Sequence, residues 1–79
     1  MSRDNLPSID NKATGENISR LMRLNHMTMG DLQFAFRFQS ANNLYKWRRG
    51  DGLPSADNLV KLAYLFNCKV DDILVLEDK

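Results

Sequence analysis

The chain has 79 residues, of which 43% are hydrophobic and 27% charged, and its formal net charge is +1. This is the size of one small globular domain, too small for the two-lobed cleft of a typical enzyme. No apolar run approaches the ~20 residues of a membrane span, the first residues resemble no signal peptide, and a lone cysteine excludes an internal disulfide or a cysteine-ligated zinc site. We therefore expect a cytoplasmic domain with neither metal nor other cofactor.

The first 13 residues are polar and lack a helical period, which predicts a flexible N-terminal arm over residues 1–13. Thr14 is the expected N-cap of a first helix that ends at about His26. Helical spacing places apolar residues on one face of this helix and two arginines on the solvent side: Ile18, Leu21 and Met22, then Arg20 and Arg23.

A short second helix is predicted after Thr28, which can form a capping box with Asp31. A turn at residues 37–39 then precedes a third helix over residues 41–49, which Ser40 can cap and Gly50 can end. The inner face of the second helix is expected to hold Leu32, Ala35 and Phe36.

Two further helices are predicted. The fourth begins after the N-cap Ser55 and ends at Asn67, and the fifth is short and begins with two aspartates that complement its dipole. Residues 77–79 are expected to fray, so that an all-α domain spans residues 14–76. The apolar stripes are Leu59, Leu62, Ala63 and Phe66 in the fourth helix and Ile73 and Leu74 in the fifth.

Charge is distributed unevenly along the chain. Residues 18–50 hold six basic residues and one acidic residue, a net charge of +5, whereas the remainder holds five basic and nine acidic residues, a net charge of −4. Such a split favours an anionic partner docking on the basic segment, although most charge runs are simply solvated surfaces.

The third helix carries the most informative surface. If Leu44 and Trp47 point inward, a turn of 100° per residue places amide, phenol and cationic groups on the opposite face, with no acidic residue from 40 to 49: Asn42, Tyr45, Lys46 and Arg49. Amides and ammonium groups can read base edges in the major groove, and guanidinium and phenol groups can hold phosphates. An ordinary solvated helix is the alternative interpretation.

In order and spacing these segments resemble the phage-repressor/Cro-like helix-turn-helix group, the XRE family. The similarity covers residues 14–76, in TGENISRLMRLNHMTMGDLQ and NNLYKWRRGDGLPSADNLVKLAYLFNCKVDDIL, and LYKWRRGDGLPSADNL is most similar to small regulators of low-GC Gram-positive bacteria and their mobile elements. The resemblance implies a compact five-helix lambda-repressor-like domain. Its second and third helices would form the helix-turn-helix, and the third would lie in the major groove.

The resemblance also implies the contacts with DNA. Base contacts are expected from residues that match the family's base-facing positions or flank them: Ala41, Asn42, Asn43 and Lys46. Phosphate contacts are expected from Thr28 and Arg49, which match backbone-contacting positions of the family. They are also expected from neighbouring residues with suitable side chains: Arg37, Ser40, Tyr45 and Arg48.

Three departures from the family pattern affect these assignments. Met29 stands where many members carry Gln, so the phosphate clamp there would rely on main-chain amides. Met22 and Arg48 replace an Arg–Glu pair of many members, which would leave Arg48 free to point at the DNA backbone. The turn between the second and third helices is one residue longer and carries Arg37 where relatives often have Gly, so the groove register stays open.

Together these features predict a sequence-specific double-stranded DNA-binding transcriptional regulator, not an enzyme, that represses by occupancy as a homodimer. The alternatives are an antitoxin-like or other protein-interaction module on the same fold and, with less support, an RNA-binding module. Apolar residues outside the core stripes would suit a dimer or partner surface: Phe34, Val60, Tyr64, Val75 and Leu76. The operator sequence and any small-molecule effector are not predicted.

Overall fold

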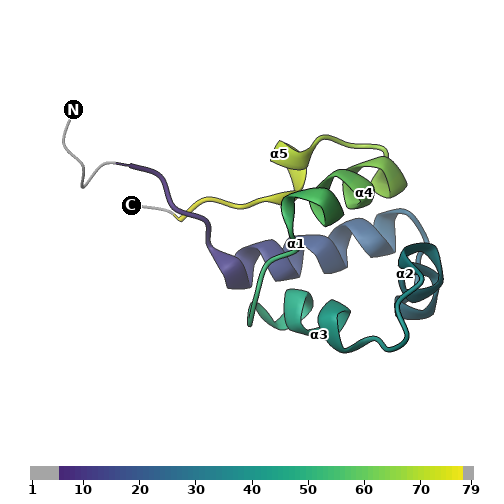
Figure 1. The fold of residues 1–79 in the computed structure, drawn as a ribbon. Helices are drawn as coiled ribbons and strands as arrows, with labels where there is room; N and C mark the ends of the chain where they lie inside the picture. Colours follow the sequence, from purple (N-terminus) through teal and green to yellow (C-terminus); the bar gives the residue numbers. More distant parts are fainter. Residues whose placement is uncertain (1–5, 78–79) are drawn as a thin grey trace.

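Five helices make up most of residues 6–77, the part of the chain that the structure, a computed structural model, describes (Figure 1). In chain order they are α1 (Asn11–Leu24), α2 (Met29–Phe36), α3 (Asn42–Arg49), α4 (Ala56–Phe66) and α5 (Val70–Ile73). Within the described residues, extended pairing is limited to an isolated bridge between Ile9 and Leu76, and no helix is long and apolar enough to cross a membrane. The predicted all-α, five-helix architecture is confirmed.

The first helix begins four residues earlier than the sequence predicted. Asp10 is its N-cap, and the Asp10 carboxylate accepts a hydrogen bond from the Ala13 N–H at 2.9 Å. The expected cap, Thr14, is instead fully buried, and its hydroxyl oxygen accepts from the Val75 N–H at 2.9 Å. The prediction of Thr14 as N-cap is therefore wrong, because this hydroxyl serves a segment 61 residues away.

The segments before α1 and after α5 run side by side, as the purple and yellow parts of Figure 1 show. The Asp10 N–H donates to the Val75 carbonyl and the Glu77 N–H donates to the Ser8 carbonyl, both at 2.8 Å. Residues 8–10 of the predicted arm are thus paired, and residues 11–13 are helical. Residues 1–5 of that arm and residues 78–79 of the predicted frayed end lie outside the described residues.

The start of α2 and its exit follow the predicted chemistry. The Thr28 hydroxyl accepts from the Asp31 N–H at 3.1 Å while the Asp31 carboxylate accepts from the Thr28 N–H at 2.8 Å, which is the expected capping box. The helix ends at Arg37, whose φ of 58° lies in the left-handed region. The site where relatives often carry Gly therefore does require a positive φ, and a residue with a Cβ there costs about 1 kcal/mol.

The third helix begins one residue later than predicted. Ala41 is its N-cap and supplies no side-chain bond, whereas the Ser40 hydroxyl accepts from the Asn42 N–H at 3.4 Å. Ser40 thus supports the first turn from outside the cap position. The predicted end is confirmed, since Gly50 adopts a φ of 80° immediately after Arg49.

The predicted ends of α4 are also confirmed. The Ser55 hydroxyl accepts from the Asn58 N–H at 3.2 Å, and Asn67 ends the helix with a φ of 53°. The Asp72 carboxylate accepts from the Lys69 N–H at 3.0 Å at the start of α5, so this acid stabilises the helix end as expected.

One apolar core joins all five helices, and the stripes predicted from the sequence supply it. Leu59 and Leu74 are half-buried, and Ala35, expected on the inner face of α2, is exposed. Phe36 and Phe38 fill the space beside α2 instead, with their rings stacked 5.2 Å apart. The buried members are Ile18, Leu21, Met22, Leu32, Leu44, Trp47, Leu62, Ala63, Phe66 and Ile73.

Two glycines allow α1 and α3 to approach closely. A Cβ at Gly15 would overlap the carbonyl oxygens of Trp47 and Arg48, and a Cβ at Gly50 would lie 2.7 Å from the Cα of Lys12. This pair of helices makes the most extensive contact between described elements. The backbone of α1 therefore sets the position of α3.

Candidate nucleic-acid interface

The buried side chains on the inner side of α3 determine which residues its outer side presents to solvent. Leu44 is 1% exposed and Trp47 is 6% exposed. The indole meets the rings of Phe36 and Phe38 edge-on, at centroid separations of 5.8 and 6.0 Å. Since aromatic pairs of this geometry resist rotation of the helix about its axis, α3 has one orientation relative to the core.

The outer side of α3 is polar, cationic and open to solvent. No residue of α3 is acidic, and the Tyr45 ring is 47% exposed. Ala41 is half-buried against the core, so only part of its methyl group is accessible at the start of the helix. Of the predicted base-contacting residues, Asn42, Asn43 and Lys46 are exposed, and of the predicted phosphate-contacting residues of α3, Tyr45 and Arg49 are exposed. Their contacts with DNA stay predictions.

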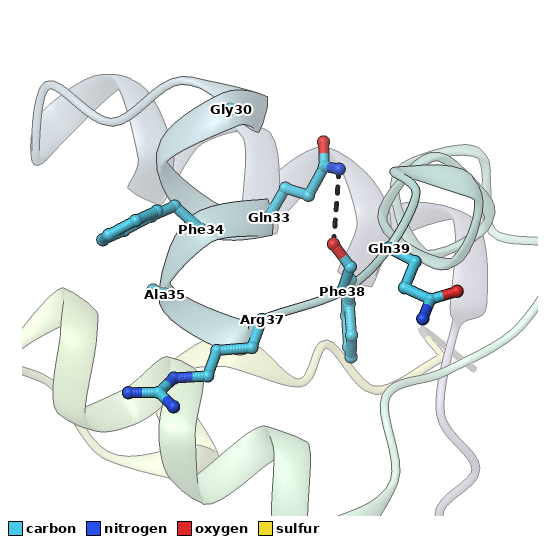
Figure 2. A pocket seen from close by; sticks show the side chains of 7 residues that line it. All are labelled: Gly30, Gln33, Phe34, Ala35, Arg37, Phe38 and Gln39. Carbon is cyan, nitrogen blue, oxygen red and sulfur yellow. Dashed lines mark hydrogen bonds between the residues drawn. The ribbon is translucent and has the colours of Figure 1, made fainter.

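A side-chain hydrogen bond from α2 stabilises the turn between α2 and α3 (Figure 2). The Gln33 side-chain amide donates to the Phe38 carbonyl at 3.3 Å, which fixes the chain just after the left-handed Arg37. The Arg37 side chain is exposed and extends away from Phe38 and Gln39. Thr28 and Ser40 are likewise exposed, so all three predicted phosphate ligands in this region are accessible.

Arg48 is not free, contrary to the expectation from the sequence. It is half-buried, and its Nε donates to the Ser19 hydroxyl of α1 at 2.8 Å. Arg48 crosses from α3 to α1 because Met22 offers it no charge and Ser19, one turn earlier on α1, offers an oxygen. No sequence pattern links these two residues, which lie 29 positions apart.

Arg49 also has a partner that the sequence analysis missed. Its Nε lies 2.8 Å from an oxygen of Asp51, and both side chains are more than half exposed. An ion pair this exposed contributes little to stability, roughly 0–1 kcal/mol. Its consequence is electrostatic, because it places one carboxylate just beyond the C-terminal end of α3.

A shallow groove of about 510 Å³ separates α1 from the exposed side of α3. It brings together residues of α3 that the sequence analysis assigned to DNA and residues of α1 to which it assigned no contact with DNA. The lining residues are Glu16, Ser19 and Arg23 from α1 and Tyr45, Arg48 and Arg49 from α3.

Comparison with known proteins agrees with this geometry. The family model of the Cro/C1-type HTH DNA-binding domain matches residues 17–79. No curated protein matches the chain significantly. The crystal structure of the DNA-binding domain of BldD superposes with a TM-score of 0.68 over 95% of this chain and 100% of that chain. At 17% sequence identity this likeness concerns the fold alone. Because the family match covers most of the sequence, the chain belongs to the family of Cro/C1-type helix-turn-helix DNA-binding domains.

Proposed function

We propose that the chain is a sequence-specific double-stranded DNA-binding transcriptional regulator that reads the major groove with α3. The observation that supports this most strongly is the outer side of α3, which has amide, phenol and cationic groups, no acid, and an orientation fixed by Leu44 and Trp47. In this reading the base edges are contacted by Ala41, Asn42, Asn43 and Lys46, of which Asn42 and Lys46 offer the donor groups suited to adenine and guanine.

With α3 in the major groove, the polar groups around it would contact the sugar-phosphate backbone. These groups lie on three elements: Thr28 at the start of α2, Arg37 and Ser40 in the turn, and Tyr45, Arg48 and Arg49 on α3. Cationic contacts of this kind release condensed counterions, so the affinity for any duplex should fall steeply with salt.

We further infer that regulation is repression by occupancy, with two copies on a two-fold symmetric operator. Two copies related by a dyad would place their α3 helices in successive major grooves, ~34–36 Å apart. The spacing of half-sites in the operator would then report the distance between the two α3 helices.

Selection of bound duplexes from a random pool tests the proposal directly. We expect enrichment of a palindromic site with half-site centres about 10 base pairs apart. An enriched site without symmetry would contradict the homodimer, and the absence of any enriched duplex would contradict the function.

A protein-interaction module, such as an antitoxin, is the second candidate function. It is favoured by Phe34 and Tyr64, each of which is 86% exposed. Co-purification with the product of an adjacent gene, abolished by Phe34→Ser and accompanied by failure of the duplex selection, would favour this function over the first.

A further inference from the structure

We propose that the groove between α1 and α3 binds a phosphate group, and that Arg23 of α1 and Arg48 of α3 are its ligands. This inference rests on the proposed function and commits to one source of the phosphate, the backbone of the bound duplex. It extends the DNA-contacting surface beyond the helix-turn-helix to α1, where the sequence analysis expected only a solvated arginine.

The charge of the groove favours an anion. Its lining carries three guanidinium groups, from Arg23, Arg48 and Arg49, and one carboxylate, from Glu16. Arg49 is paired with Asp51 outside the lining, so the groove keeps a net positive charge mainly through Arg23 and Arg48. The Tyr45 hydroxyl adds a neutral hydrogen-bond donor. One guanidinium group can donate two parallel hydrogen bonds to two oxygens of the same phosphate. It therefore suits phosphate better than it suits a monatomic anion.

The position of the groove suits a backbone that follows α3. A second hollow, of about 210 Å³, continues from it towards Thr28 at the start of α2, and Ser19, Arg23 and Arg48 line both. These three residues therefore lie between the exposed side of α3 and the start of α2. A strand that passes from Tyr45 to Thr28 crosses them.

Ser19 acts here as a positioning residue. Its oxygen accepts from the Arg48 Nε at 2.8 Å, and its hydroxyl donates to the Gly15 carbonyl at 3.3 Å. Because Nε is engaged with α1, the two terminal nitrogens, which carry four of the five guanidinium N–H donors, are the groups that meet the phosphate. A half-buried arginine that is already oriented loses less side-chain entropy on binding than a freely moving one.

Arg20 provides a matched control on the same helix. It is exposed like Arg23, but its Nε donates to the Asn17 side-chain oxygen at 3.0 Å. Asn17 in turn donates to the carbonyls of Asp72 and Ile73, which places this pair on the α5 side of α1. Replacing Arg20 or Arg23 by Gln changes the net charge equally. A difference in duplex affinity between the two variants would therefore reflect the position of the arginine and not the loss of charge alone.

The test measures duplex affinity against salt for the wild type and both variants, using the full chain and a duplex selected as above. We expect Arg23→Gln to weaken binding about tenfold at low salt and to lower the slope of log K against log[salt] by about 0.9, the value of one phosphate. Arg20→Gln should stay within about twofold of the wild type. Thermal unfolding of each variant verifies the fold.

A double-mutant cycle tests the role of Ser19. Ser19→Ala should weaken binding about threefold in the wild-type background and have no effect in the Arg48→Gln background, because its contribution passes through Arg48. Equal losses in both backgrounds would show that Ser19 acts on the fold and would overturn its positioning role.

Two results would overturn the phosphate site. One is an Arg23→Gln variant whose affinity and slope match those of Arg20→Gln while the wild type binds with a steep slope, which leaves the proposed function intact. The other is a result in which the wild type binds millimolar inorganic phosphate and Arg23→Gln does not, while both bind the duplex equally well. That result would assign the groove to a free anion. If the wild type binds no duplex at any salt concentration, the proposed function fails and the inference with it.

Discussion

The backbone at Arg37 has a φ of 58°, a conformation that favours glycine over any residue with a Cβ. The family often places Gly at this position, whereas this chain places a cation there, at the exit of α2 and beside the predicted DNA surface. Arginine at this position therefore lowers the stability of the fold and adds a positive charge to the predicted DNA surface.

Arg37→Gly should therefore stabilise the fold by about 1 kcal/mol, which corresponds to a rise in Tm of roughly 4–8 °C for a domain of this size. Arg37→Ala is the control, because it removes the same charge and keeps a Cβ at a positive φ. We expect equal loss of duplex affinity in both variants and a higher Tm only for glycine, measured by calorimetry and fluorescence anisotropy. Equal Tm values would show that the left-handed conformation costs nothing here.

A second residue-scale prediction separates base contacts from phosphate contacts on α3. Lys46→Ala should cost about 1–3 kcal/mol on the selected site and relax its base preference, because a groove-facing ammonium group would be lost. Arg49→Ala should weaken all duplexes alike. Competition binding against single-base variants of the site measures both, and a Lys46→Ala variant with unchanged preference would remove this residue from the base-contacting set.

At the scale of the elements, most helix ends could be predicted from the sequence because their chemistry is local. The capping box at Thr28, the cap at Ser55 and the left-handed stop at Asn67 each involve residues within four positions of one another. The start of α1 was predicted wrongly although its cap, Asp10, is also local, because Thr14, which resembles a cap in the sequence, bonds to Val75 across the fold. The groove between α1 and α3 could not be predicted from the sequence, because Arg48 and Ser19 meet only after both helices pack.

The bond from Val75 to Thr14 gives an element-scale prediction. Thr14→Val keeps the shape of the buried side chain but leaves the Val75 N–H without its acceptor, which should cost about 1–3 kcal/mol of unfolding free energy. Thr14→Ser, which keeps the hydroxyl, should retain most of that stability. Urea unfolding measures both changes, and hydrogen exchange at the Val75 amide should quicken in Thr14→Val alone. Unchanged exchange there would show that this hydrogen bond does not hold the C-terminal segment.

At the scale of the whole molecule, the described surface divides into a cationic side and an acidic remainder. Arg23 of α1 and Arg48 and Arg49 of α3 gather around one groove, whereas α5 and the segment after it hold Asp71, Asp72 and Glu77. A distribution of this kind orients the protein as it approaches a polyanion and disfavours binding through the wrong side. The sequence predicted this division from the charges of residues 18–50, although not that α1 would share the groove with α3.

The whole-molecule prediction concerns stoichiometry. On a selected palindromic duplex, sedimentation should detect two copies of the chain, and on a duplex with one half-site replaced it should detect one copy at lower affinity. The half-site duplex is the control, since it preserves all contacts within one copy. Saturation of the palindrome by a single copy would exclude the homodimer.

The pairing of Ser8 with Glu77 and of Asp10 with Val75 means that the polypeptide enters and leaves the globule at one pole, at the opposite end from α2 in Figure 1. A module attached at either place would emerge beside the other, at the end of the molecule away from α2. The domain could accordingly be spliced into a surface loop of a host protein with short linkers, because the host's chain would be interrupted by only a narrow gap.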